Sequence, residues 1–162
     1  MISAETIHRC AVEMHRCEEE CSKLHVGIMA VMNQQPLKDK VIALSENHIL
    51  PSYGAFSWNF DGCKHPYRYT DGGHRTDKEY ELQTVDEIAE SLLHDLTHYA
   101  DTDTDRIKKL KDRVTRQREQ VAQYKKFCED MGKVVAWVET EYAKMVENNS
   151  NAETDLLSEL GI

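Results

Sequence analysis

The feature that most constrains this chain is an apolar stripe over residues 107–145, whose members recur at alternating intervals of three and four. An α-helix turns once in about 3.6 residues, so a stripe repeating every 3.5 stays on one face only when helices wind around each other left-handedly. A lone helix cannot bury so long a seam, and the pattern therefore predicts a second helix packed along it. The stripe consists of Ile107, Leu110, Val114, Gln117, Val121, Tyr124, Cys128, Met131, Val135, Val138, Tyr142 and Met145.

A second stripe with the same spacing lies near the start of the chain and follows Ser3, a suitable helix N-cap. It predicts a helix over residues 4–34. The helix should end before Pro36, because proline disfavours helical geometry at the preceding residue. The members of this stripe are Ile7, Cys10, Met14, Cys17, Cys21, Leu24, Ile28 and Val31.

The two stripes predict a mostly α fold in which helices 4–34 and 105–147 pack as a coiled-coil hairpin or within a homodimer. We favour the homodimer, because the later stripe is longer than the earlier one and a single partner helix would leave part of it uncovered. Gln117 would then be the polar core position that sets the register. The expected oligomer seam is Ile107, Leu110, Val114, Gln117, Val121, Tyr124, Val135 and Val138.

Residues 36–100 predict a small α+β module between the long helices. A short helical pattern at 37–49 is followed by strand patterns over 53–60, 63–70 and 75–83, which are separated by Asp-Gly turn signals. These patterns predict a three-stranded antiparallel meander, which would need helices to pack on. Thr84 and Glu87 match a capping box and predict a further helix that begins at residue 85.

Aspartates alternate with threonines at 101–105, just before the long helix. The apolar spacing would allow one unbroken helix through this run. Short polar side chains compete for backbone hydrogen bonds, however, so we favour a break, with Asp103 or Thr104 as the cap of a new helix. Calcium binding is disfavoured, because Arg106 stands where a calcium-binding loop needs glycine.

Asparagines at 148–151 predict the end of regular structure. The expected organisation is a long helix at 1–35, the α+β module at 36–100, a coiled-coil helix at 101–147 and an acidic flexible tail at 148–162. Two interpretations of the tail stay open. It is either a frayed end or short helix that folds back, or a docking motif for a partner groove that uses Leu156, Leu157 and Leu160.

Charge and composition narrow the classes of function. The net charge is −9, and an acidic segment at 71–105 precedes a basic one at 106–146. An acidic chain is a poor general ligand for nucleic acid or anionic lipid. The sequence shows no apolar run of bilayer length and no signal-peptide pattern. Five cysteines without framework spacing argue against a disulfide scaffold. We therefore expect a cytoplasmic protein.

One motif suggests an enzyme. His94 and His98 lie four residues apart, which places them on one helix face at a spacing that can hold a metal ion. Asp95 occupies the position of the glutamate base in the H-E-x-x-H motif of zinc peptidases, and Asp101 is a candidate third ligand. A metal-dependent hydrolase is therefore one alternative. The histidines fall on the outer side of the expected helix, so solvated or packing roles are favoured and we expect no bound metal or cofactor.

A basic stretch at 106–118 carries seven Lys or Arg residues and one acidic residue. Contact with phosphates makes a nucleic-acid-binding protein the second alternative. No aromatic residue interleaves with these charges, and pairing with the acidic segment at 71–105 is simpler.

The favoured function is therefore a non-enzymatic, acidic coiled-coil protein that binds and regulates a larger protein, as an adaptor or as an inhibitor of an enzyme such as a protease or nuclease. Its distinctive features are packing and charge rather than catalytic motifs. The residues expected to contact the partner are Asp77, Glu79, Glu81, Trp58, Leu156, Leu157 and Leu160.

Overall fold

The computed structural model describes residues 2–49, 52–53, 56–58, 67–71, 74–75 and 82–162. The chain divides into two compact units, and two of its helices contribute to both. Unit 1 comprises residues 1–27 and 79–128, and unit 2 comprises residues 28–78 and 129–162.

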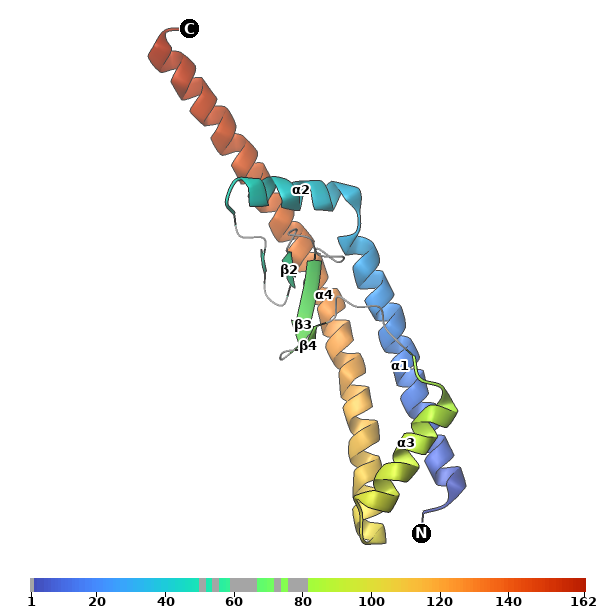
Figure 1. Cartoon of the computed structure of the whole chain (residues 1–162). Coiled ribbons are helices and arrows are strands. Elements are labelled where there is room, and N and C mark those ends of the chain that lie inside the picture. Colours follow the sequence, from blue (N-terminus) through green and yellow to red (C-terminus); the bar gives the residue numbers. More distant parts are fainter. Residues whose placement is uncertain (1, 50–51, 54–55, 59–66, 72–73, 76–81) are drawn as a thin grey trace. The chain divides into compact units, whose positions relative to one another are not determined.

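Unit 1 is built from three helices: the first part of α1 (Ala4–Met32), α3 (Val85–His98) and the first part of α4 (Asp103–Leu160). α3 lies against both α1 and α4 (Figure 1), and the shared core explains why. Each helix turns an apolar stripe inward, so that burial of these side chains stabilises all three contacts at once. The core residues are Ile7, Ala11, Met14, Ile88, Leu92, Leu96 and Leu110.

The predicted helix starts in unit 1 are confirmed by their caps. Ser3 Oγ accepts a hydrogen bond from the Thr6 amide at 3.2 Å. Thr84 Oγ1 accepts one from the Glu87 amide at 3.1 Å, and the Thr84 hydroxyl donates back to the Glu87 carboxylate at 3.1 Å. These bonds satisfy amide groups that have no partner within the first helical turn.

The predicted break before the long helix is also confirmed, although the capping residue differs. α3 ends at His98, α4 begins at Asp103, and Thr102 Oγ1 accepts a hydrogen bond from the Asp105 amide at 3.1 Å. Thr102, rather than Asp103 or Thr104, is therefore the cap. The side chain of an Asp or Thr cap accepts a hydrogen bond from an amide two or three residues ahead. Three such residues in a row can each do so, and the sequence therefore does not determine which of them is the cap.

Unit 2 contains α2 (Gln35–Glu46) and four short strands, with the end of α1 and the remainder of α4. α2 buries Leu37, Val41 and Leu44. Its Lys40 reaches α4, where the Nζ atom lies 3.4 Å from Glu139 Oε1 and 5.7 Å from the ring centre of Tyr142.

The strands are β1 (Ser52–Tyr53), β2 (Phe56–Trp58), β3 (Tyr67–Asp71) and β4 (His74–Arg75). They pair antiparallel with their neighbours in chain order. Tyr53 pairs with Phe56, Trp58 with Tyr67, and Asp71 with His74.

The predicted fold class is wrong in its three-stranded meander. The described regular structure is almost entirely the four helices, and strand is limited to segments of two to five residues. The pattern over 53–60 was interpreted as one strand, whereas β1 and β2 pair with each other. Alternating side chains look the same in one continuous strand and in two short strands that follow each other, so the pattern alone does not divide them. Residues 76–81 of the predicted third strand lie outside the described part.

The buried side of α4 departs from the predicted stripe. Ile107 is 60 % exposed, and Val114, Gln117 and Val135 are only half-buried. At Phe127 and Val134 the buried residue lies one position before the predicted one, whereas Val138 and Met145 keep their predicted positions. The buried residues of α4 are Leu110, Val121, Tyr124, Phe127, Val134, Val138 and Met145.

Much of this stripe is covered within a single chain. In unit 1 the ring centres of Tyr124 and His25 are 6.4 Å apart, and the Cys128 thiol lies 3.9 Å from the Leu24 carbonyl oxygen. At these two positions the stripe on α4 is therefore covered within one chain, and the oligomer seam stays a prediction. The homodimer itself stays a prediction.

The predicted end of the long helix is wrong. α4 continues through residues 148–151 to Leu160. Asparagine costs a helix interior only about 0.7 kcal/mol, which an established helix can tolerate. The actual stop signal is Gly161, which has a positive φ of 69°. There the Ile162 amide bonds the Leu157 carbonyl at 2.9 Å, the bond that typically closes a helix with a C-terminal glycine.

Among the described residues, no helix combines the length and apolarity needed to cross a membrane.

Candidate functional site

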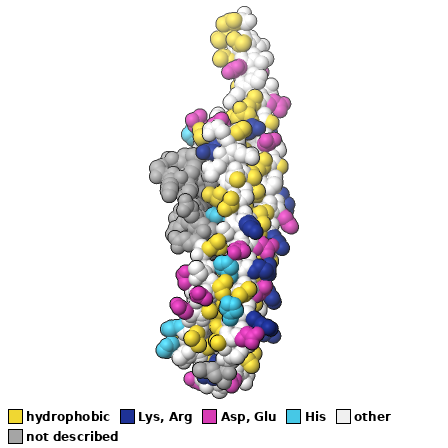
Figure 2. Space-filling model, turned by 90° about the vertical axis from the view of Figure 1, so that its right-hand side faces the viewer, with side chains coloured by type: hydrophobic (Ala, Val, Ile, Leu, Met, Phe, Trp, Pro, Cys, Tyr) yellow, Lys and Arg dark blue, Asp and Glu magenta, His cyan; other side chains and the backbone are white. Residues whose placement is uncertain are grey.

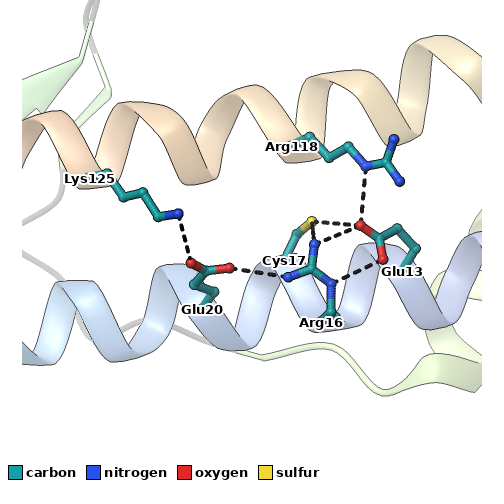
Figure 3. Close-up of polar contacts among 6 residues, drawn as sticks. All are labelled: Glu13, Arg16, Cys17, Glu20, Arg118 and Lys125. Atoms are coloured by element: carbon teal, nitrogen blue, oxygen red, sulfur yellow. Dashed lines mark hydrogen bonds and ion pairs between the residues drawn. The ribbon is translucent and has the colours of Figure 1, made fainter.

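A cluster of charges joins α1 to α4 in unit 1 (Figure 3). Glu13 on α1 pairs with Arg16 one turn later, at 2.7 Å, and with Arg118 on α4, at 3.1 Å. Glu20, two turns along α1, pairs with Arg16 and with Lys125 of α4, each at 3.2 Å. The two carboxylates therefore alternate with three cations along the line where the helices meet.

Glu13 is the most strongly perturbed of these groups. Hydrogen bonds from Arg16, and then from Arg118, lower the pKa of its carboxyl to about 2, against the opposing effect of burial. Both cations stabilise the carboxylate form. Glu13 is therefore held ionised, and an ionised carboxylate with two arginine partners is a structural link rather than a proton donor.

The neighbouring thiol of Cys17 lies in the core. Cys17 is buried, and burial raises the pKa of its thiol. Its sulfur lies 3.6 Å from an Arg16 nitrogen and 3.8 Å from a Glu13 oxygen. Reactive cysteines need a stabilised thiolate and access to solvent. Cys17 has neither, which agrees with the core role expected from its place on the stripe.

Two adjoining hollows lie between α1 and α4 in unit 1, beside this charge cluster. Each has a volume of about 370 Å³, and Thr6 and Cys10 line both. We call the pair the α1/α4 groove. One hollow is apolar and is completed by Ile2, Ser3, Ile107 and Leu110. The other is more polar and is completed by Arg9, Glu13, Val114 and Arg118.

A third hollow, of about 490 Å³, lies between α1 and α3 on the other side of Ile2. Its apolar floor includes Ile7 and Leu93, and Asp86 and Glu90 make its rim acidic. Leu93 is half exposed. The two sides of α1 thus differ in charge.

The histidine pair that the sequence offers as an alternative metal site lies on α3. The ring centres of His94 and His98 are 4.4 Å apart on the exposed side of α3. Asp95, proposed as the base, forms a short ion pair with Arg113 of α4 and is therefore committed to a structural contact. Nowhere in the described residues do three potential ligands, Asp101 included, come together around a metal position.

The basic stretch of α4 is partly used within unit 1. Arg113 pairs with Asp95, and Arg106 pairs with Asp103 at 2.8 Å, so two of the pairs reach the acidic segment as expected. Arg118 instead pairs with Glu13. Lys108, Lys111 and Arg116 are exposed. The free positive charge on this stretch is therefore smaller than its sequence indicates.

The other predicted contact residues belong to unit 2 or lie outside the described part. Every residue from 146 to 162 is exposed, including Leu156, Leu157 and Leu160. Hydrophobic side chains gather on the segment that ends at the C-terminus (Figure 2). Asp77, Glu79 and Glu81 lie outside the described residues, and of Trp58 only its place in β2 is described.

Sequence reasoning missed the α1/α4 groove and the Glu13 cluster, because both depend on which helices meet. The tail was found as a candidate, but its helical state was not. The signal that could have revealed it was the sequence Leu160-Gly161-Ile162, a helix C-terminus with glycine at the left-handed position.

The chain matches no family model, no curated protein sequence and no solved structure. Its function is therefore argued from its own surfaces.

Proposed function

We propose that this protein is a non-enzymatic binding protein that regulates a larger protein by docking the end of α4 into a groove of that protein. We call residues 146–160 the tail helix. The observation that supports the proposal is that this segment is helical and carries large apolar side chains although all of its residues are exposed.

The apolar residues of the tail helix share one face. Val146, Leu157 and Leu160 are separated by whole turns, and Leu156 lies beside Leu157. The exposed fractions are 48 % for Val146, 53 % for Leu156, 48 % for Leu157 and 61 % for Leu160. Complete burial of one leucine side chain is worth about 1.5–3 kcal/mol, so three leucines supply a substantial part of the free energy of a specific complex.

Charge defines the chemistry of the partner. The tail helix has four acidic residues and no Lys or Arg, namely Glu147, Glu153, Asp155 and Glu159. Glu153 shares the face of Val146 and Leu160, since it is seven residues from each. The fitting partner surface is therefore an apolar groove bordered by Lys or Arg, which takes an amphipathic helix with anchors spaced by one turn.

The test is a capture experiment with matched variants of the full chain. Leu156→Ser/Leu157→Ser removes two anchors, and Ser158→Ala changes the opposite, polar face of the same turn. Wild type and Ser158→Ala should capture the same partner, whereas the double leucine variant should lose it. A peptide of residues 146–162 should displace the partner. Capture that survives in the double leucine variant, with unchanged circular dichroism, would refute the proposal.

A further inference from the structure

We propose that the α1/α4 groove of one copy receives the tail helix of a second copy of this chain. The inference rests on the proposed function in one respect, namely that the tail helix is a docking segment. It adds a binding site on this chain, the α1/α4 groove, and names a second copy of the chain as the source of the helix that fills it. The groove lies in unit 1 and the tail helix in unit 2, so each copy carries one of each.

The apolar parts of the two surfaces match. The hollow nearer the start of α4 is lined mainly by Ile2, Cys10, Ile107 and Leu110. Ile107 is 60 % exposed and therefore leaves apolar surface uncovered beside this hollow. Leu157 and Leu160 could fill this hollow, and they would bury Ile107 together with their own exposed surface. The contact would thereby cover apolar area on both copies.

The charges are complementary. The second hollow has Arg9 and Arg118 on its rim. Lys111 is exposed and shares the helix face of Ile107 and Val114, which places a third cation along the same border. Arg118 pairs with Glu13, the one carboxylate that lines this hollow, and Arg9 pairs with Glu5 at 3.1 Å, so the three cations of the border stand against two carboxylates and leave it with a positive excess. An acidic helix with no basic residue fits this border better than a neutral or basic one.

The spacing of the groove residues on α4 matches the spacing of the docking residues on the tail helix, and it defines the direction in which the tail helix lies. Ile107 and Val114 line different hollows and are seven residues apart on α4, about 10 Å along the helix. Glu153 and Leu160 are also seven residues apart on one face. Leu160 in the apolar hollow places Glu153 beside the cations of the other. The docked tail helix therefore runs antiparallel to the α4 segment that receives it.

A second copy is the fitting occupant, rather than the chain's own tail, because the groove residues on α4 and the tail helix belong to the same uninterrupted helix. With one groove and one tail helix per copy, the exchange can be reciprocal in a two-fold dimer, which closes without leaving either surface free. Self-association would then compete with the larger partner for the tail helix.

The test uses charge reversal on each side of the contact and measures mass by sedimentation equilibrium over a wide concentration range. The groove variant is Arg9→Glu/Lys111→Glu, the tail variant is Glu153→Lys/Glu159→Lys, and the complementary variant carries all four changes. Wild type should approach twice the chain mass of 18.7 kDa. The groove and tail variants should each have a dimer dissociation constant raised about tenfold or more, and the complementary variant should recover most of that loss.

The matched control is Lys126→Glu/Lys133→Glu, which reverses two lysines of α4 outside the groove and should leave the dissociation constant unchanged. A wild-type chain that stays monomeric, or a dimer that responds equally to all the variants, would overturn the inference. Its failure is separable from that of the proposed function. A monomeric wild type that still needs its leucines for partner capture refutes only the groove assignment, whereas a reversible dimer without leucine-dependent capture refutes only the larger partner.

Discussion

Glu13 shows how a single residue can connect two helices that are distant in sequence. It lies on α1 and bonds Arg118, which is more than a hundred positions later on α4. Nothing in the spacing of charges on either helix predicts this pair, because the apolar stripes define which sides face inward but not how far one helix slides along the other. The pair therefore had to be found in the structure, whereas the core positions of Ile7 and Met14 followed from the stripe itself.

Glu13→Gln should lower the stability of unit 1 and change its pH dependence. The pKa of Glu13 is lowered from its ordinary value of 4.5 to about 2 by Arg16 and Arg118. The folded state therefore gains stability above pH 4.5 and loses it as the pH falls through 2. The carboxylate is partly exposed, so we expect an effect of only about 1 kcal/mol at neutral pH.

Urea unfolding at a series of pH values between neutral and strongly acidic measures this effect. The difference between wild type and Glu13→Gln should be present at neutral pH and should shrink as the solution becomes acidic. Glu119→Gln, at an exposed position on α4, serves as the control and should leave the unfolding midpoint unchanged. A constant difference across the series would contradict the assigned role.

Arg106 is the second residue whose contacts determine local structure. It donates to the Leu96 carbonyl at 3.3 Å and to the Ala100 carbonyl at 3.5 Å, and it pairs with Asp103. Arg106→Ala should therefore loosen the turn between α3 and α4 and destabilise unit 1 by about 1–2 kcal/mol. Arg106→Lys should restore little of the lost stability, because lysine lacks the planar guanidinium group that donates several hydrogen bonds at once.

Thermal unfolding and amide hydrogen exchange of residues 96–106 measure this loss. Arg116→Ala is the control, since within the described part of the chain that guanidinium bonds the Asp112 carbonyl of its own helix and no residue of the turn. Equal midpoints for Arg106→Ala and Arg116→Ala would show that the turn does not depend on Arg106.

At the scale of elements, helical spacing predicted the existence of the long helices better than it predicted their ends. The start of α3 was placed correctly, because the capping box requires a threonine and a glutamate at a fixed spacing, and Thr84 and Glu87 bond each other. The end of α4 was misplaced, because asparagines weaken a helix without stopping it. The short strands were misjudged for a related reason, since alternation reports an extended chain but not where that chain turns.

Removal of residues 150–162 should leave thermal stability almost unchanged, because every residue of this segment is exposed. We expect the unfolding temperature to shift by less than about 2 °C, while partner capture and self-association are lost. Differential scanning calorimetry and sedimentation measure the two effects on the same sample. A clear drop in the unfolding temperature of the monomer would mean that the segment packs against its own chain.

At the scale of the whole molecule, the stripe on α4 is divided between two units. Its early part contributes Leu110 to the core of unit 1, and its later part contributes Val138, which is buried in unit 2. The continuous stripe thus predicted one helix–helix seam, whereas different segments of the chain pack against its early and its later part. The sequence contains the period of the stripe but not the identity of the helix that covers each part of it.

Two matched substitutions can establish whether the units lose stability separately. Leu92 is 1 % exposed in unit 1, and Leu44 is fully buried in unit 2. Each leucine-to-alanine change leaves a cavity and should lower the free energy of unfolding of the unit that contains it by about 2–5 kcal/mol. Native-state hydrogen exchange should therefore show reduced protection mainly in 1–27 and 82–128 for Leu92→Ala, and mainly in 28–46 and 129–145 for Leu44→Ala. Uniform loss of protection in both variants would mean that α1 and α4, which run through both units, make the chain unfold as one cooperative body.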